Sequence, residues 1–271
     1  MAAAMTVVSG CGSDKGKSAS KPTGSISVYA ASSLQGPFEA IGKRFESANS
    51  GVKVNFRFGA SEALFKLVDP RSRHARGVAD VFATSDPVVI HGLSGNDESH
   101  GNDEVTGNAN SDTIFVNDAL EIVTAPGNPK KILALSDLAK PTVKVVLGSR
   151  RNKIGVVARN LLTKNTVAVH HAISAANAAG VVDAVASGRA DAGIVYGSDA
   201  APAGKKVAGV PIPESQNLVT DYEVALTLNA STNVLAKSFM TFLFTGDSRK
   251  DLADGGFQPI SCSACQPNFP Q

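Results

Sequence analysis

The chain has 271 residues, enough for one large domain or for two lobes of roughly 100–150 residues each. Apolar residues make up 43% and charged residues 18% of the chain, a composition that excludes an intrinsically disordered protein. The 26 Lys and Arg residues nearly balance the 24 Asp and Glu residues, so the net charge of +2 indicates no nucleic-acid or polyanion partner. No run approaches the ~20 apolar residues that a membrane-spanning helix needs. Trp is absent, which argues against stacking platforms for bases or sugars.

The N-terminal segment, residues 1–24, is predicted to be a signal remnant followed by a flexible tether. Cys11 follows Val8-Ser9-Gly10, and this order of an aliphatic residue, two small residues and a Cys resembles a bacterial lipobox, whose Cys is lipidated. The next stretch is rich in Ser, Gly and Lys without apolar periodicity, which is typical of a tether. The ten residues before Cys11 contain no Lys or Arg, so the charged start of a signal is missing. Cys11 is therefore either the anchor of a longer precursor or an incidental thiol.

Short β-branched runs alternate with amphipathic segments along the chain, which is the pattern of an α/β protein. In chain order, strands are predicted at residues 25–30, 52–58, 79–83, 119–124, 143–147, 192–196 and 222–228. The spacing of four apolar residues from Leu34 to Phe45 predicts a helix after the first strand. Because a proline inside a helix clashes with the preceding turn, this helix is expected to begin at Pro37, which leaves Ser33 in a loop. Further helices are predicted near residues 61–68, 155–162, 181–187 and 235–243.

Two segments break the α/β pattern. Residues 94–112 are almost wholly polar, and the spacing of their acids matches no EF-hand or calcium-binding nonapeptide, so a solvated loop is favoured over a calcium site. Cys262 and Cys265 form a Cys-x-x-Cys in a C-terminal tail predicted over residues 258–271, whereas a redox motif should open a helix after a strand. A local disulfide or a loose tail is favoured, and nothing nearby completes a zinc site.

Hydroxyl groups follow two predicted strands where a helix should begin. Ala31-Ser32-Ser33 follows the first strand, and Gly59-Ala60-Ser61 follows the second. A helix N-terminus attracts anions because its unpaired backbone N–H groups and the helix dipole both favour negative charge. Either serine alone is better explained as a simple helix cap. Two such sites at one edge of a sheet favour an anion-binding site.

Five blocks of the chain carry recognisable motifs: residues 28–34 (VYAASSL), 79–86 (ADVFATSD), 125–132, 188–200 (GRADAGIVYGSDA) and 211–217. Together these blocks resemble one family, the periplasmic molybdate-binding proteins of ABC importers. Matches run in order from about Ser25 to Phe257, and the block that ends in GIVYGSDA is the most specific.

The resemblance implies a type II periplasmic-binding fold of α/β class, in which two lobes, each a mixed sheet flanked by helices, are hinged by two crossing strands. Lobe one would hold residues 25–112 and 224–257, and lobe two residues 113–223. The family holds its dianion between the lobes with hydroxyl and backbone N–H groups alone. Carried over by motif, the oxyanion-binding residues would be Ser33, Ser61, Ile154, Ala178 and Tyr196.

A site made only of donors suits a fully ionised tetrahedral oxyanion, because that ion offers only acceptors and a protonated analogue would bring an unmatched O–H. Molybdate and tungstate are nearly equal in size and should bind alike, whereas sulfate is smaller. Residues 150–154 (RRNKI) depart from the family, which usually has Pro-Ala-Gly near this position. Ile154 could crowd the site, and the three cations are either a solvated loop or a source of extra anion affinity.

The sequence thus predicts an extracytoplasmic solute-binding protein, periplasmic or anchored at the cell surface through Cys11. It would capture molybdate, with tungstate as a second ligand, and deliver it to the permease subunits of an ABC importer. It is expected to be a monomer, without catalysis, cofactor, nucleic-acid partner or direct cation ligands. The alternatives are a binder of another oxyanion such as sulfate and a diverged homologue that binds nothing. A phosphate-handling hydrolase is disfavoured, because the chain has no Gly-x-Ser-x-Gly elbow or P-loop and no His in a strand-end motif.

Overall fold

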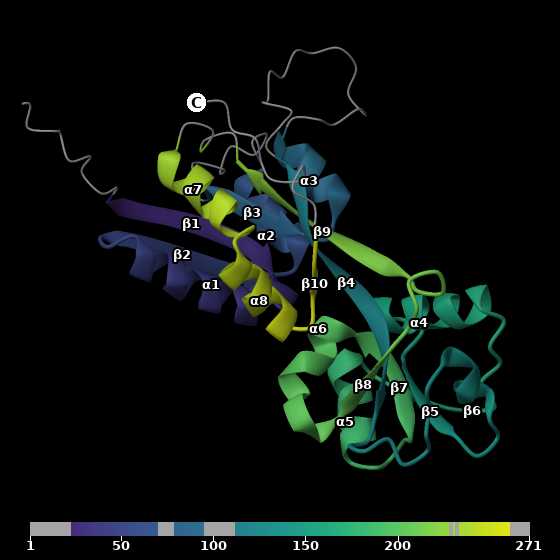
Figure 1. Ribbon diagram of the computed structural model, residues 1–271. Coiled ribbons are helices and arrows are strands. Elements are labelled where there is room, and N and C mark those ends of the chain that lie inside the picture. The colour runs from purple at the N-terminus through teal and green to yellow at the C-terminus, as the bar shows by residue number, and fades with distance from the viewer. Residues whose placement is uncertain (1–22, 70–78, 95–111, 228–229, 231–232, 261–271) are drawn as a thin grey trace, which may run out of the picture.

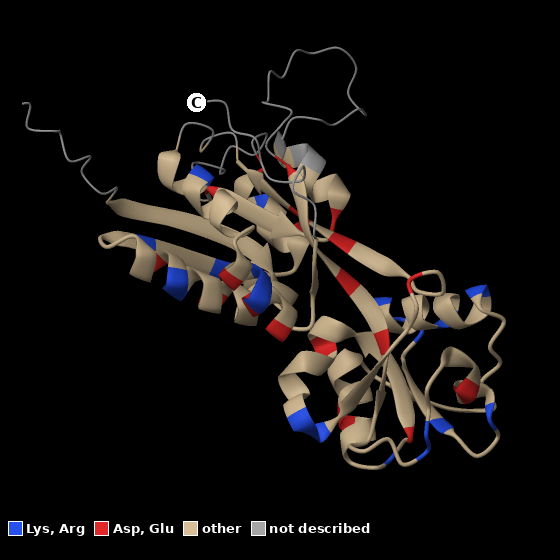
Figure 2. Cartoon of the chain, in the orientation of Figure 1, with Lys and Arg blue, Asp and Glu red and all other residues tan. Residues whose placement is uncertain are grey.

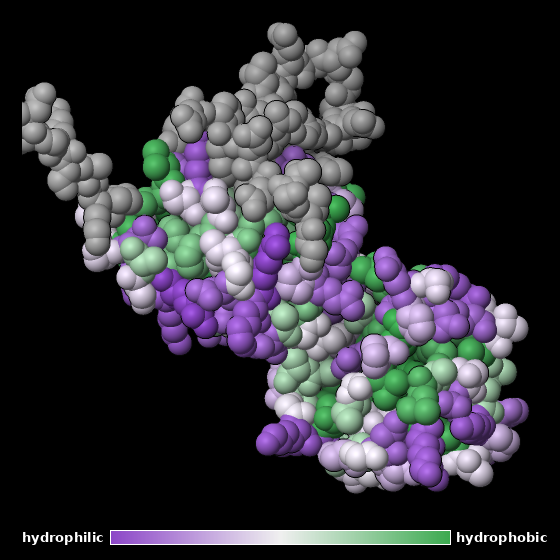
Figure 3. Space-filling model, viewed as in Figure 1, coloured by the Kyte–Doolittle hydropathy of each residue, from purple (hydrophilic) through white to green (hydrophobic). Residues whose placement is uncertain are grey.

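The strands follow one another across a curled mixed sheet in the order β2-β1-β3-β9-β4-β7-β5-β6, and β8 and β10 pair onto β4. The structure is a computed structural model that describes residues 23–69, 79–94, 112–227, 230 and 233–260. The sheet passes through two lobes that a narrow waist separates (Figure 1, Figure 3). The predicted α/β class with two lobes is confirmed.

Several predictions fall outside the described residues. They concern Cys11 with most of its tether, residues 95–111 of the polar segment, and the Cys262 and Cys265 pair. Residues 258–259, with which the tail was expected to begin, instead form β10 (Gln258–Pro259), an antiparallel partner of β4. Within the described part of the chain, no helix is long and apolar enough to cross a membrane.

Lobe one is built on three parallel strands, β1 (Gly24–Ala31), β2 (Val52–Gly59) and β3 (Val81–Thr84). One face is covered by α1 (Gln35–Ala48), α7 (Val234–Phe242) and α8 (Gly246–Asp254), and the other by α2 (Ser61–Val68) and α3 (Pro87–Ser94) (Figure 1). The apolar stripe of α1 is fully buried, and its Phe45 ring meets Phe239 of α7 edge to face at 5.3 Å. This aromatic packing fixes α1, and with it the turn that carries Ser33, against the sheet.

Lobe two, like lobe one, has a sheet with helices on both of its faces. Its strands are β5 (Lys144–Gly148), β6 (His171–Ala175), β7 (Ala192–Tyr196) and β8 (Ala208–Pro211). The helices are α4 (Lys153–Lys164), α5 (Ala178–Ala186) and α6 (Gly197–Ala200), with the 3-10 segments η2 (Leu135–Ala139) and η3 (Ala201–Lys206). Helix α4 packs on one face of the sheet and α5 on the other. Gly188, with φ +72°, ends the turn after α5, as the sequence indicates.

Two long strands join the lobes. Strand β4 (Thr113–Thr124) pairs with β9 (Val219–Leu226) through Ala119, and from Leu120 onward it pairs with β7 and β8 of lobe two. At its other end β9 pairs with β3 of lobe one. Because β4 and β9 belong to both lobes, a rotation of one lobe against the other bends the chain where these strands pass between them.

One local prediction near the expected site is wrong, and one alternative considered for Ser61 does not hold. Helix α1 begins at Gln35, not at Pro37, and Ser33 lies in the 3-10 turn η1 (Ser32–Leu34) that leads directly into it. Proline is tolerated here because its missing N–H falls in the first turn, where no intrahelical acceptor exists. Ser61 does not cap α2: Ala60 is the N-cap residue and Ser61 is the first helical residue. Its hydroxyl is therefore free of a capping role.

Candidate functional site

Ser33 lies beside a phenol of the hinge strand β9. The Ser33 Oγ and Tyr222 Oη atoms are 2.9 Å apart, although 189 positions separate them in the chain. Tyr222 is 7% exposed, and Ser85 also lies within hydrogen-bonding reach of its phenol. Burial raises the pKa of Tyr222 to about 12, so the phenol keeps its proton at neutral pH and remains a hydrogen-bond donor.

Ser61 is held by a hydroxyl of the neighbouring strand β3. Thr84, the last residue of β3 and fully buried, donates its Oγ1 proton to Ser61 Oγ at 2.5 Å. The same Thr84 oxygen accepts the backbone N–H of Asp86 at 3.1 Å. Since β1, β2 and β3 are parallel neighbours, the turns that follow them, with Ser33, Ser61 and Asp86, lie at one edge of the sheet.

Tyr196 of lobe two places its hydroxyl group beside the same hinge strand, β9. It ends β7, and its Oη lies 3.0 Å from Thr220 Oγ1 on β9. Thr220 and Tyr222 are two residues apart on one strand, so their side chains point to the same face. That face of β9 therefore collects Ser33 from lobe one and Tyr196 from lobe two. Burial raises the pKa of Tyr196, so this phenol too stays a donor.

We refer to these groups as the hydroxyl cluster. Its members are Ser33, Ser61, Thr84, Tyr196, Thr220 and Tyr222. Each of the three hydroxyls that the sequence predicted thus has a hydroxyl partner that sequence reasoning missed. Thr84 lies inside the quoted block 79–86, and its place at the end of a parallel strand is a signal that could have identified it.

Ile154 does not crowd the cluster with its side chain. The side chain is 4% exposed and packs into the core of lobe two. Its Cγ2 atom occupies space left by Gly148, where a Cβ atom would come within 2.7 Å of it. The backbone N–H of Ile154, which the resemblance assigns to the ligand, donates to the side chain of the N-cap residue Asn152 at 3.1 Å.

Ala178 is the first residue of α5, at a helix end with free donors. The N-cap residue Asn177 accepts the N–H of Gly180 at 2.9 Å. This cap leaves the N–H groups of Ala178 and Ala179 without an intrahelical partner, because the first amides of a helix have no carbonyl in reach. Ala178 is therefore placed to offer a backbone donor.

The loop before α4 keeps its cations at the surface. Arg150, Arg151 and Lys153 are all exposed. Arg159 lies behind them and donates to the carbonyls of Gly148 at 2.8 Å and Gly155 at 2.6 Å. Burial, followed by repulsion from Arg150, lowers the pKa of Arg159. This arrangement favours the interpretation of residues 150–153 as a solvated basic loop.

A buried carboxyl group lies next to the hydroxyl cluster. Asp118 of β4 is paired with Thr220 of β9, is 2% exposed, and accepts the hydroxyl of Ser198 at 2.6 Å and its amide at 3.3 Å. Burial raises the pKa of Asp118 to about 7; the hydrogen bonds from Ser198 oppose this shift, and the charges of Asp199 and Glu121 contribute to it. Figure 2 shows acidic bands on β4 and β9 between the lobes and Lys and Arg away from this junction. The hydroxyl cluster itself contains only neutral groups.

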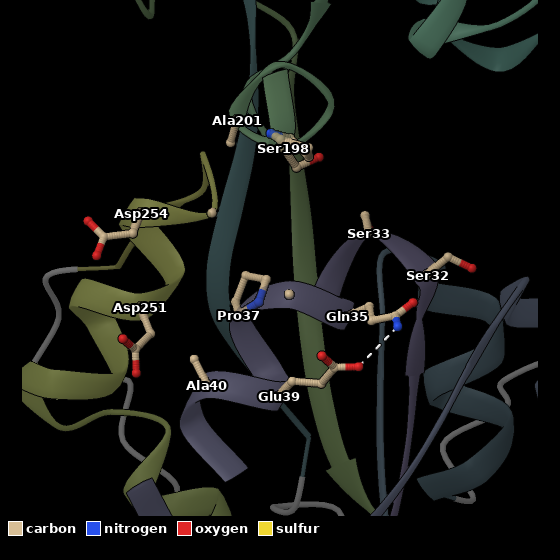
Figure 4. Close-up of a pocket in the computed structure, with 13 residues that line it drawn as sticks. Ser32, Ser33, Gln35, Pro37, Glu39, Ala40, Ser198, Ala201, Asp251 and Asp254 are labelled. Atoms are coloured by element: carbon tan, nitrogen blue, oxygen red, sulfur yellow. Dashed lines mark hydrogen bonds between the residues drawn. The ribbon is translucent and has the colours of Figure 1, made fainter. Parts of the chain in front are cut away.

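A groove of about 700 Å³ opens between the lobes beside Ser33. Figure 4 shows Ser198 and Ala201 of lobe two across the groove from Ser32 and Ser33 of lobe one. Of the five residues predicted to bind the oxyanion, Ser33 is the one that lines this groove. Its lining includes the carboxylates of Glu39, Asp251 and Asp254 from α1 and α8, which disfavour an anion in that part of the groove.

The chemistry available to the hydroxyl cluster is hydrogen-bond donation. It contains no Cys or His, and in the described ranges of the chain no group of three His, Cys, Asp or Glu residues could hold a metal ion. Neutral hydroxyls cannot neutralise charge, but in a closed site they can replace the water molecules around an anion one by one.

The comparison with known families decides the class of protein. The model of the bacterial extracellular solute-binding protein family matches residues 26–258. The chain belongs to this family. Solute-binding proteins of this kind act outside the cytoplasm in transport, and the family is not one of enzymes.

Three of the proteins similar to this chain have names that refer to molybdate, molybdenum or sulfate. The molybdate-binding protein ModA of Mycobacterium bovis is 33% identical over 254 residues, which cover 91% of each chain. A substrate-binding domain from Clostridium difficile, assigned to a molybdenum ABC transporter, superposes with a TM-score of 0.73 at 21% identity and covers 88% of this chain and 99% of its own. The sulfate-binding protein SubI of Mycobacterium tuberculosis has a TM-score of 0.60 at 23% identity, with 91% and 92% covered.

Proposed function

We propose that the protein captures a fully ionised tetrahedral oxyanion, molybdate or the similarly sized tungstate, and delivers it to the permease subunits of an ABC importer. The observation that carries this proposal is the meeting of Ser33 and Tyr196, from different lobes, on one face of β9. The 33% identity to a molybdate-binding protein over 91% of the chain supports the choice of ligand.

The proposed ligands are the hydroxyls of Ser33, Ser61 and Tyr196 and the backbone N–H groups of Ala178 and Ile154. The Ala178 amide stands at a helix N-terminus with no intrahelical acceptor, so it can donate without losing a bond. The Ile154 amide would first have to leave Asn152. Each donor that fails to reach an anion in a dry site costs about 1–3 kcal/mol, which is why the smaller sulfate should bind more weakly.

We propose that lobe one comprises residues 25–112 and 224–257 and lobe two residues 113–223, with closure about β4 and β9. The protein is further proposed to work as a monomer, to be held at the cell surface through a lipid on Cys11, and to need no cofactor and carry out no catalysis. The absence of catalysis and of a cofactor follows from the role of a carrier, which binds its ligand and releases it unchanged, whereas the lipid anchor rests on the likeness of Val8-Ser9-Gly10-Cys11 to a lipobox.

The proposal is tested by calorimetric titration and thermal melting with molybdate, tungstate, sulfate and hydrogen phosphate. Molybdate and tungstate should bind with similar affinity, and a concentration of 100 times the dissociation constant should add ~2.7 kcal/mol of stability. Sulfate is the competing ligand, and it should bind at least tenfold more weakly. Tighter binding of sulfate than of molybdate, or no stabilisation by any of the four anions, would overturn the proposal.

A further inference from the structure

Thr84 holds Ser61 through a chain of hydrogen bonds that starts at the backbone. The Asp86 N–H donates to Thr84 Oγ1 at 3.1 Å, and Thr84 Oγ1 donates to Ser61 Oγ at 2.5 Å. The Asp86 residue is itself fixed, because its carboxylate accepts the N–H of Val88 at the start of α3. Thr84 is fully buried, so no solvent competes for its hydroxyl.

Both hydrogen bonds of this chain run in one direction, from Asp86 through Thr84 to Ser61. A backbone N–H can only donate, so Thr84 accepts from Asp86, and its own proton is the one donated to Ser61. Ser61 thereby receives a proton, and its own proton is left for a third partner. The two other pairs of the cluster lack this constraint, because in Ser33–Tyr222 and in Tyr196–Thr220 either oxygen could be the donor.

We infer that Thr84 is a specificity-determining positioning residue that keeps the Ser61 hydroxyl pointing as a donor at the bound anion. The inference rests on the proposed function, since it takes Ser61 to face that anion. A Ser61 hydroxyl that accepts a proton from Thr84 has one of its two lone pairs occupied and its own proton free for the anion, so the O–H of a protonated oxyanion would meet that proton. The buried threonine thus excludes anions that carry a proton, although it does not touch the ligand.

The anion pair that isolates this effect is sulfate and hydrogen phosphate at about pH 8. The two ions carry the same double charge and have nearly the same size, but only hydrogen phosphate has a proton to donate. The ratio of the two affinities therefore reports whether the Ser61 hydroxyl donates to the anion, and it is insensitive to the charge and radius of the ion. Molybdate is titrated alongside them as the measure of overall binding.

The variants are Thr84→Val, which keeps the shape of the side chain without the hydroxyl, and Thr84→Ser, which keeps the hydroxyl. Thr84→Val should weaken molybdate and sulfate about tenfold, the effect of about one lost hydrogen bond, and hydrogen phosphate less than threefold. The preference for sulfate over hydrogen phosphate then falls several-fold, while Thr84→Ser keeps it. Melting of the unliganded proteins confirms folding, and Thr84→Ala replaces Thr84→Val if the latter does not fold.

A double-mutant cycle with Ser61→Ala separates positioning from packing. If Thr84 acts through Ser61, then Thr84→Val changes the anion preference by less than twofold once Ser61 is alanine. Equal weakening of both anions by Thr84→Val, a Thr84→Ser variant that behaves like Thr84→Val, or the same change in both backgrounds would each overturn the inference. Absence of molybdate binding by the wild-type protein would instead refute the proposed function, so the two failures are distinguishable.

Discussion

The replacement Asp118→Asn tests whether a buried acid at the hinge controls stability. Asp118 has an ordinary pKa of 3.8 as a free carboxyl and a pKa of about 7 in the folded protein, because burial disfavours its charge. At about 1.4 kcal/mol per pH unit, this difference corresponds to about 4 kcal/mol. The side chain is 2% exposed, so solvent does not screen the effect. Asparagine has the same shape, can still accept the Ser198 amide, and cannot ionise.

The sign of the effect follows from which state holds the proton. Below about pH 4 the carboxyl is protonated in both the folded and the unfolded chain, so the wild type suffers no penalty. Between about pH 4 and 7 the unfolded chain releases a proton that the folded protein keeps, and stability falls as the pH rises. Above about pH 7 the folded protein holds a buried charge, and the full cost applies. Asp118→Asn should therefore be more stable than the wild type by up to about 4 kcal/mol at pH 8.

The assay is urea unfolding at several pH values between about 4.5 and 8, followed by circular dichroism because the chain has no Trp. The quantity of interest is the difference in free energy of unfolding between the variant and the wild type, which should grow with pH and level off above about 7. Asp183→Asn, an exposed carboxyl on α5, is the matched control and should show no such growth. A difference for Asp118→Asn that is independent of pH would refute the reasoning.

Three further expectations concern the ligand and the loop that frames the site. Molybdate should bind more weakly at pH 8 than at pH 6 in the wild type, because ionised Asp118 repels a dianion, and titrations of Asp118→Asn should show no such dependence. The replacements Ser61→Ala and Tyr196→Phe should each weaken molybdate binding about tenfold without unfolding the protein; wild-type titration curves for both would show that the site is assigned wrongly. Gly155→Ala should lower stability by about 1–3 kcal/mol in thermal melting, since its Cβ would come within 2.0 Å of a backbone oxygen. Gly246→Ala, with open space around it, is the control and should be nearly neutral.

Strong patterns in the sequence predicted the helices and strands whose buried faces consist of apolar residues. The apolar spacing from Leu34 to Phe45 predicted the core face of α1, and small and β-branched residues predicted the buried strand β7. Strand β6 was missed because it lies at the edge of the sheet and its side chains are half-buried or exposed. Helix α8 was missed because its buried residues include Ser248 and Asp251, which are polar. Asp251 is stabilised by an ion pair with Arg44, 207 positions away, which no local pattern reveals.

The site was predictable in part, and the missing part has a common cause. Motif resemblance singled out Ser33, Ser61 and Tyr196. Their partners Thr220 and Tyr222 belong to a strand whose sequence is ordinary, and only the return of β9 between the lobes brings them to the site. The side chain of Ile154 was expected to approach the ligand. Gly148 has no Cβ atom, and the space that this leaves lets the Ile154 side chain pack into the core.

The most direct test of the central claim is a crystal structure of the protein with molybdate, in which anomalous scattering locates the molybdenum atom. The account predicts a single strong peak between the lobes, with molybdate oxygens within hydrogen-bonding distance of Ser33, Ser61 and Tyr196. A peak in the acidic groove or on the basic loop before α4, away from these three hydroxyls, would contradict it.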